Sequence, residues 1–238
     1  MSTCDVAGFA NYVVAMLAIK TLCFDKKIIT LKEYLEVVRN NWEGNEELLY
    51  KVRHCPHYCD NTEESNALSN RLHNDLYRAL DGIENEHGGS FILNYYAYRE
   101  FILMAKDIRA TPDGRRNGEM FAQGIGPSKY HKADSLADVV ESICNLDREK
   151  FTVGALDIVL PFGKTTNEQV VMMLKAFAKE GIKYLQINCV SADDLKEARK
   201  HPEQYQHLVV RVTGFSAKFV SLSPEFQEEI MKRYTYGG

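Results

Sequence analysis

The sequence has no excess of positive charge and no long hydrophobic run, and each absence excludes a class of protein. Lysine and arginine together number 29, against 33 aspartates and glutamates, and the formal net charge is −4. Nucleic-acid-binding proteins usually carry a basic excess, so we expect no nucleic-acid partner. No apolar run approaches the roughly 20 residues that a membrane-spanning helix needs, so we expect no membrane partner.

Cysteine is also sparse, and its six positions are scattered along the chain. A chain of 238 residues with 45% hydrophobic content can build an apolar core without disulfide bonds. The start, Met1–Asp5, lacks the basic segment of a secretory signal peptide. The sequence therefore predicts a cytoplasmic protein with reduced thiols. The cysteines are Cys4, Cys23, Cys55, Cys59, Cys144 and Cys189.

Capping motifs and apolar periodicity place the helices and strands. Thr30–Glu33 and Thr166–Gln169 read as capping boxes, in which the two end side chains satisfy free backbone amides reciprocally. Strands alternate with helices in the second half, which indicates an α/β fold. Helices are predicted over residues 6–24, 31–40, 46–52, 63–83, 167–180, 192–200 and 224–233, and strands over 91–96, 155–160, 184–188 and 209–212.

Gly214 lies between the apolar strand at 209–212 and the run Phe215-Ser216-Ala217. Taken alone, such a glycine is most often a bend that needs positive φ or a close backbone approach. The motifs around it change this interpretation, because they follow one another in a characteristic order. They are Ala110–Arg116, Gln186–Ser191, Leu195–Ala198, Pro202–Tyr205 and Val209–Phe219.

In this order, the chain from Ala110 onward resembles the glycine radical domain of the pyruvate formate-lyase-like family of glycyl radical enzymes. Residues 15–20, 41–44 and 56–58 resemble the region that precedes this domain. The resemblance implies the C-terminal part of the glycyl radical enzyme α/β barrel, with helices packed around a few strands and a C-terminal glycyl radical loop. Residues 1–104 would form the end of the barrel domain, mainly helical, and residues 105–238 the glycine radical domain.

The resemblance also implies a chemistry. A backbone Cα radical is stabilised between an amide nitrogen that donates electrons and a carbonyl that withdraws them, in a planar centre that a side chain would crowd. Gly214 would be the radical site, and a radical S-adenosylmethionine activase would install the radical. The chain itself would bind no cofactor and no metal. The residues beside the radical in the loop would be Arg211, Val212, Thr213, Phe215 and Ser216.

The implied reaction is radical chemistry on a small-molecule substrate. Formate acetyltransferase activity is the default within this family, and dehydratases and decarboxylases share the same radical loop. The residues that distinguish these substrates are expected mostly outside this chain. The reaction type therefore stays open at the level of sequence.

The sequence departs from the family pattern at the catalytic cysteine. In the family, the glycyl radical generates a thiyl radical on a cysteine that glutamate follows two residues later. None of the six cysteines has glutamate at this offset. We therefore expect another chain to supply the cysteine half of the barrel, with poor solubility of this chain alone because its strand edges and inner apolar face would be open. A non-catalytic complementing subunit and an inactive truncated fragment are alternatives, and a homodimer is one assembly that the resemblance allows.

A second departure lies at Gly126–Tyr130, Gly-Pro-Ser-Lys-Tyr, where the family usually has a Gly-Pro-Thr-Ala-like run. Three other patterns have rival interpretations. The run His54–Cys59 crowds two histidines and two thiols together, but structural zinc sites usually use two separated ligand pairs. Gly124-Ile125-Gly126 is a weak match to a phosphate-binding loop, because a third glycine is missing. Glu228-Glu229 fits a solvated helix face better than a catalytic carboxylate pair.

Overall fold

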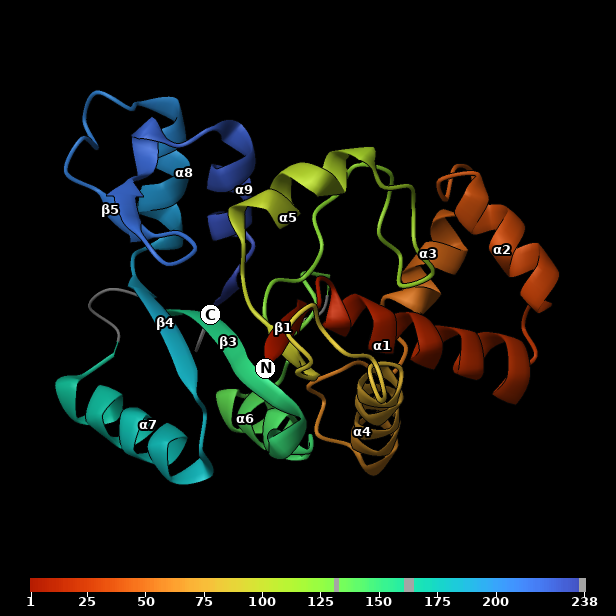
Figure 1. Ribbon diagram of the computed structural model, residues 1–238. Coiled ribbons are helices and arrows are strands. Elements are labelled where there is room, and N and C mark those ends of the chain that lie inside the picture. Colours follow the sequence, from red (N-terminus) through yellow and green to blue (C-terminus); the bar gives the residue numbers. More distant parts are fainter. Residues whose placement is uncertain (131–132, 161–164, 236–238) are drawn as a thin grey trace.

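A parallel β-sheet lies at the centre of the computed structural model, which describes residues 1–130, 133–160 and 165–235 (Figure 1). Four strands follow sequence order across the sheet, and β7 (Tyr234–Thr235) pairs in parallel with β3. The predicted α/β fold is confirmed. The four strands are β1 (Ser2–Asp5), β2 (Phe91–Tyr95), β3 (Phe151–Leu160) and β4 (Tyr184–Cys189).

Strand β3 is the longest strand and joins two parts of the sheet. Its first residues pair with β2, where Leu93 lies opposite Phe151, and its last six pair with β4, from Ala155–Tyr184 to Leu160–Cys189. A short antiparallel hairpin, β5 (Val209–Arg211) with β6 (Ser216–Lys218), stands apart from this sheet. Figure 1 shows β5 at one end of the molecule with α8 (Ala192–Lys200) and α9 (Pro224–Met231).

Both predicted capping boxes are present. The Thr30 hydroxyl accepts from the Glu33 amide, and the Glu33 carboxylate accepts from the Thr30 amide; Thr166 and Gln169 repeat this exchange. Gly181 ends the second of these helices in the left-handed conformation, as predicted. The remaining helices are α1 (Phe9–Ile19), α2 (Leu31–Arg39), α3 (Glu46–Val52), α4 (Glu63–Arg78), α5 (Arg99–Met104), α6 (Leu136–Cys144) and α7 (Asn167–Glu180).

Some boundaries differ from the sequence prediction. The first helix begins at Phe9, because Gly8 has a φ of 74°, and it continues past Ile19 as a π-helical segment, Lys20–Asp25. Helix α6 was not predicted, although Ser135 caps it by accepting from the Asp138 amide. Strand β1 was also missed, because four residues are too few to show a clear alternation.

Two apolar clusters pack helices and the β5–β6 hairpin against the sheet. The larger one joins Phe9 of α1, Tyr95 of β2, Val139 of α6 and Ile158 of β3, so it draws on both predicted domains. The second one joins Val159 to Leu195, Val210, Phe219 and Ile230, and so packs the hairpin and the last two helices onto the sheet. The predicted division between residues 104 and 105 stays a prediction.

Within the described residues, no helix has the length and apolar character needed to cross a membrane.

Candidate active site

Gly214 lies at the tip of the β5–β6 hairpin. Arg211 pairs with Ser216 across the hairpin, and the Val212 amide donates to the Phe215 carbonyl oxygen at 2.8 Å, which closes a tight turn. Gly214 has a φ of 94°, a conformation that residues with a side chain rarely adopt. The backbone of the loop therefore favours glycine at this position.

The space around Gly214 does not require glycine. A methyl group built on its Cα would have the Tyr96 hydroxyl as its nearest neighbour, at 3.6 Å, which is an ordinary van der Waals contact. Gly214 is also exposed on the surface of this chain. In the folded structure, alanine at position 214 would be disfavoured by the backbone conformation and not by a lack of space.

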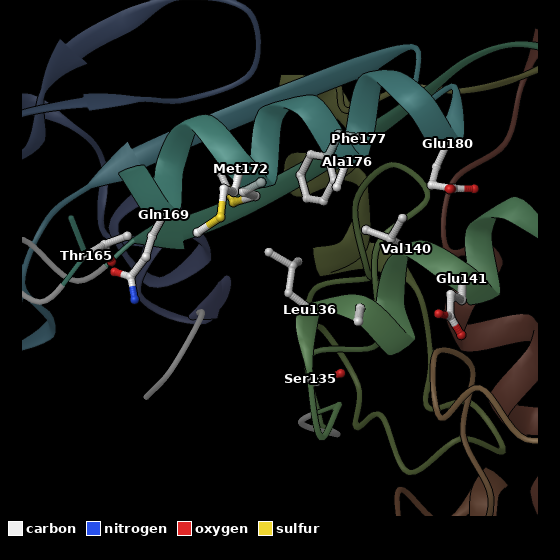
Figure 2. Close-up of a pocket in the computed structure, with 12 residues that line it drawn as sticks. Ser135, Leu136, Val140, Glu141, Thr165, Gln169, Met172, Ala176, Phe177 and Glu180 are labelled. Atoms are coloured by element: carbon white, nitrogen blue, oxygen red, sulfur yellow. The ribbon is translucent and has the colours of Figure 1, made fainter. Parts of the chain in front are cut away.

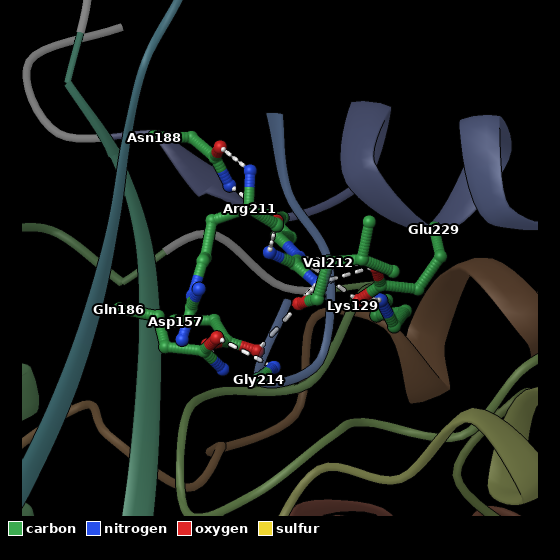
Figure 3. A network of polar contacts seen from close by, with 9 residues as sticks. Lys129, Asp157, Gln186, Asn188, Arg211, Val212, Gly214 and Glu229 are labelled. Atoms are coloured by element: carbon green, nitrogen blue, oxygen red, sulfur yellow. Dashed lines mark hydrogen bonds and ion pairs between the residues drawn. The ribbon is translucent and has the colours of Figure 1, made fainter. Parts of the chain in front are cut away.

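The amide of Gly214 is held by the sheet below it. Its N–H donates to Gln186 Oε1 at 3.1 Å, and Gln186 Nε2 donates to Asp157 Oδ1 at 2.6 Å (Figure 3). Asp157 and Gln186 are direct neighbours across β3 and β4, and both are buried. The sheet thus reaches the loop tip through two side chains.

The base of the loop is held from two other directions. The Asn188 side chain hydrogen-bonds to both backbone groups of Arg211. Its Oδ1 accepts from the Arg211 amide at 2.6 Å, and its Nδ2 donates to the Arg211 carbonyl oxygen at 3.0 Å. Arg233, just beyond α9, donates to the carbonyl oxygens of Arg211 at 2.8 Å and Val212 at 2.6 Å. Two consecutive carbonyls of the loop are therefore tied to one guanidinium group.

Four buried charged groups surround these contacts. Arg233 pairs with Glu229 at 2.8 Å and lies 3.8 Å from Asp157, while Lys129 pairs with Glu229 at 3.1 Å. The exposed fraction of each of these side chains is at most 7%. Among the residues that the structure describes, these two positive and two negative side chains lie together, and their attraction offsets part of the cost of removing each one from water.

Burial and charge act in opposite directions on the two carboxylates. Burial raises the pKa of Asp157 to about 6, although nearby Arg233 opposes this shift. Burial also disfavours the charged form of Glu229, but Lys129 and Arg233 outweigh it, so the pKa of Glu229 lies below its usual value. Both carboxylates are therefore ionised at neutral pH, with Asp157 the easier one to protonate.

The structure places the six predicted loop residues in one hairpin, with Arg211 and Ser216 at the ends of its strands. It also shows a support that the sequence did not predict. Arg211, Val212 and Gly214 are bonded to this support, while Phe215 and Ser216 are exposed and Thr213 is partly buried. The interpretation of Glu229 as a solvated residue was wrong, because its side chain is fully buried in the charged cluster. The spacing of Glu229 and Arg233, four residues apart on one helical face, was the signal that could have revealed the pair.

The rival metal cluster does not assemble. The His54 ring nitrogen Nδ1 contacts the Tyr50 carbonyl oxygen at 2.7 Å, and the Cys55 thiol donates to the Lys51 carbonyl oxygen. Burial raises the pKa of Cys55 to about 11 and that of Cys59 well above its usual value, so both thiols stay protonated at neutral pH. Among the residues that the structure describes, no group of three or more histidine, cysteine or acidic side chains is arranged to hold a metal ion.

A groove of about 590 Å³ lies away from the loop, between α6 and α7 (Figure 2). Its lining is mostly apolar and includes Leu136, Val140, Met172 and Phe177. None of the residues that line it belongs to the Gly214 loop or to its charged support. The groove is therefore separate from the candidate site.

Two family models match this chain. Residues 1–103 match the family model described as pyruvate formate lyase-like, and residues 121–220, which include Gly214, match the model described as glycine radical. The chain belongs to the glycyl radical enzymes. Lyases and dehydratases are among the relatives of this chain. An isethionate sulfite-lyase of Bilophila wadsworthia is 26% identical over 238 residues, covering 96% of this chain and 28% of the relative.

Other similar proteins are dehydratases. The trans-4-hydroxy-L-proline dehydratase of Clostridioides difficile is 26% identical over 95% of this chain and 29% of its own length. The crystal structure of a hydroxyproline dehydratase from the same organism superposes with a TM-score of 0.89 at 25% identity, over 98% of this chain and 30% of the other. The B12-independent glycerol dehydratase of Clostridium butyricum gives a TM-score of 0.86 at 25% identity, over 98% and 31%. This chain thus spans less than a third of the relatives that it matches.

Proposed function

We propose that this chain is the radical-bearing portion of a glycyl radical lyase or dehydratase and that Gly214 stores the radical. An activase that makes an organic radical from S-adenosylmethionine would remove one hydrogen atom from the Gly214 Cα. The electron left behind would be shared between the flanking amide nitrogen and the carbonyl. The observation that carries the proposal is the Gly214 turn itself, an exposed tip without crowding at Cα whose amide and base are nevertheless held by buried groups.

The radical would next take a hydrogen atom from a cysteine thiol. We propose that this cysteine lies outside the present residues, because none of the six cysteines here has the family's glutamate two residues later. Four of them also have a pKa raised by burial, which marks them as packed thiols. The thiyl radical would then act on a small-molecule substrate.

The relatives favour a lyase or a dehydratase for the reaction. Isethionate sulfite-lyases, a sulfopropanediol dehydratase and a hydroxyproline dehydratase are among the matched proteins. Formate acetyltransferase activity stays an alternative. Assays of the activated chain, combined with the polypeptide that supplies the cysteine, on isethionate, trans-4-hydroxy-L-proline, glycerol, and pyruvate with coenzyme A would separate these reactions.

A second candidate is a complementing subunit that donates a glycyl radical domain to another polypeptide. The same lack of a Cys-x-Glu sequence favours it. Purification from the native source under anaerobic conditions distinguishes the two: a complementing subunit would copurify with a chain that carries Cys-x-Glu. The cytoplasm is the proposed location of either form.

Oxygen provides the test of the radical position. A backbone Cα radical reacts with oxygen and the chain breaks there, so activated protein exposed to air should yield two fragments that meet at Gly214. Mass spectrometry would locate the break. Gly44→Ala is the matched control, since Gly44 also has positive φ, at 69°, and open space around its Cα. Cleavage should persist in Gly44→Ala and vanish in Gly214→Ala; a chain that stays intact in air after activation would refute the assignment.

A further inference from the structure

Gln186 contacts the loop beside the proposed spin-bearing atom. The Gly214 N–H donates to its Oε1 at 3.1 Å, so the acceptor touches one of the two peptide groups that flank the Gly214 Cα. The Gln186 side chain is held in turn by Asp157, its neighbour across the sheet, at 2.6 Å. These contacts link the loop tip to the paired strands β3 and β4.

The orientation of the Gln186 amide is fixed by what its two partners can do. A backbone N–H only donates, and an ionised carboxylate only accepts. The Gln186 oxygen must therefore face Gly214 while its nitrogen faces Asp157, and the reversed orientation would break both contacts. Asp157 thus decides which end of the amide the loop meets.

The sheet does not need this side-chain pair for its own pairing. Strands β3 and β4 are already matched over six consecutive residue pairs, from Ala155–Tyr184 to Leu160–Cys189. Burying a carboxylate here also has a cost, which Arg233 at 3.8 Å only partly offsets. The Asp157–Gln186 pair thus costs free energy and is not needed to pair the strands. Its contact with the Gly214 amide suggests that it serves the loop.

We propose that Gln186, oriented by Asp157, is a positioning residue for the glycyl radical, with its Oε1 fixing the plane of the Thr213–Gly214 peptide beside the radical carbon. The proposal rests on the proposed function of Gly214. Delocalisation needs the nitrogen lone pair to overlap the half-filled orbital on Cα, so rotation of this peptide would weaken it. An acceptor on the N–H also increases the electron density at nitrogen, which strengthens its donation to the radical.

A swap of the two side chains isolates this role. In the double variant Asp157→Asn/Gln186→Glu, the asparagine nitrogen can donate to one glutamate oxygen while the other accepts from Gly214. The swap also keeps one negative charge near Arg233, Lys129 and Glu229. The single variant Gln186→Leu removes the acceptor, and Asp157→Asn removes the group that orients it.

The first measurement needs no radical. Protein labelled with ¹⁵N-glycine gives one amide signal for Gly214, identified by its loss in Gly214→Ala, and NMR follows the exchange of this amide with solvent. Exchange should be about tenfold faster in Gln186→Leu, as expected for the loss of one hydrogen bond. It should be intermediate in Asp157→Asn, and the swap should return it to within about threefold of wild type. Unchanged exchange in Gln186→Leu, or no recovery in a folded swap variant, would overturn the proposal.

The second measurement counts unpaired electrons per chain after anaerobic activation. Gln186→Leu should hold severalfold fewer than wild type, and the swap should restore the yield. If wild type itself shows no unpaired electron, the proposed function fails, and the exchange measurement still decides whether Gln186 holds the loop. A wild-type radical with an equal yield in Gln186→Leu contradicts the positioning role alone.

Discussion

Two glycines with positive φ, Gly124 and Gly214, occupy contrasting places in the molecule. A methyl group on Gly124 would overlap with the carbonyl oxygen of Ala155 in β3, which no packed structure allows. The cause is local, because the Ile125 amide donates to the same oxygen at 2.9 Å and draws the loop onto the strand. At Gly214 the nearest atom to such a methyl group is 3.6 Å away.

The contrast separates two reasons for glycine. Position 124 requires glycine because its backbone lies directly against strand β3. This close approach explains Gly124 without a phosphate-binding role for the run Gly124-Ile125-Gly126. At Gly214 the folded structure penalises a side chain only through its φ of 94°. Under the proposed function, the further reason for glycine at position 214 is that its Cα carries the radical. The following predictions test this difference between the two glycines.

Alanine at each glycine has the largest expected difference. Gly124→Ala should lower the free energy of unfolding by about 4 kcal/mol or more, because the loop must leave β3. Gly214→Ala should lower it by only about 1–2 kcal/mol, the cost of a left-handed conformation for a residue with a side chain. Denaturant unfolding followed by circular dichroism measures both. Similar losses for the two variants would remove the distinction between the two loops.

The charged support should matter for the Gly214 loop and not for the Gly124 loop. Arg233→Met leaves Glu229 and Asp157 buried without their shared cation, and should cost about 3 kcal/mol of unfolding free energy. The double variant Arg233→Met/Asp157→Asn should recover part of this loss, because it also removes the carboxylate that has lost its cation, while Lys129 still pairs with Glu229. Limited proteolysis should then cut near residues 211–215 first. Initial cutting near residue 124 would contradict this account.

The pH dependence of stability should reveal Asp157. Burial raises its pKa to about 6 from an ordinary 3.8, so the folded state holds this proton more tightly than the unfolded state does. The stabilising contribution of the protonated form is complete below about pH 3.8, and it is lost as the pH rises through 6, by about 3 kcal/mol in total. Arg233 keeps its charge in this window because the neighbouring carboxylates raise its pKa, and Glu229 stays ionised because its pKa is lowered.

The measurement is the difference in unfolding free energy between wild type and Asp157→Asn from pH 5 to pH 7.5. Wild type should lose stability relative to the variant as the pH increases. Because all other titrating groups are shared, a difference that stays constant with pH would contradict the buried, ionisable Asp157.

A helix cap far from both loops gives the smallest effect. Thr166→Ala removes the hydroxyl that accepts from the Gln169 amide at the start of α7 and should cost about 1 kcal/mol. Neither cleavage at Gly214 nor the exchange of its amide should change. A change in either would mean that general loss of stability, rather than the local support, controls the loop.

Local signals in the sequence predicted the elements that have local causes. The capping boxes at Thr30 and Thr166 determined two helix starts, and Gly181 determined a helix end. The helix at Leu136 was missed although Ser135 and Asp138 carry its capping signal. The start of this helix therefore also has a local cause in the sequence.

The support of the candidate site could not be predicted in the same way. Lys129, Asp157, Gln186 and Arg233 are far apart in the chain and meet only through tertiary packing. Lys129 lies in the segment 126–130, where the sequence departs from the family run, so the resemblance gave no guide to its role either. The local signs of buried polar contacts were the spacing of Glu229 and Arg233 and the acidic Asp157 between Leu156 and Ile158 in an apolar strand, and neither sign names its distant partners.

Electron paramagnetic resonance of the anaerobically activated chain tests the central claim most directly. One hydrogen remains on the Cα of a glycyl radical, so the spectrum should be a doublet, and the doublet should collapse when the protein contains glycine deuterated at Cα. Gly214→Ala should abolish the doublet, whereas Gly44→Ala should leave it unchanged. A doublet that persists in Gly214→Ala, or activated wild-type protein without any signal, would contradict storage of the unpaired electron at this residue.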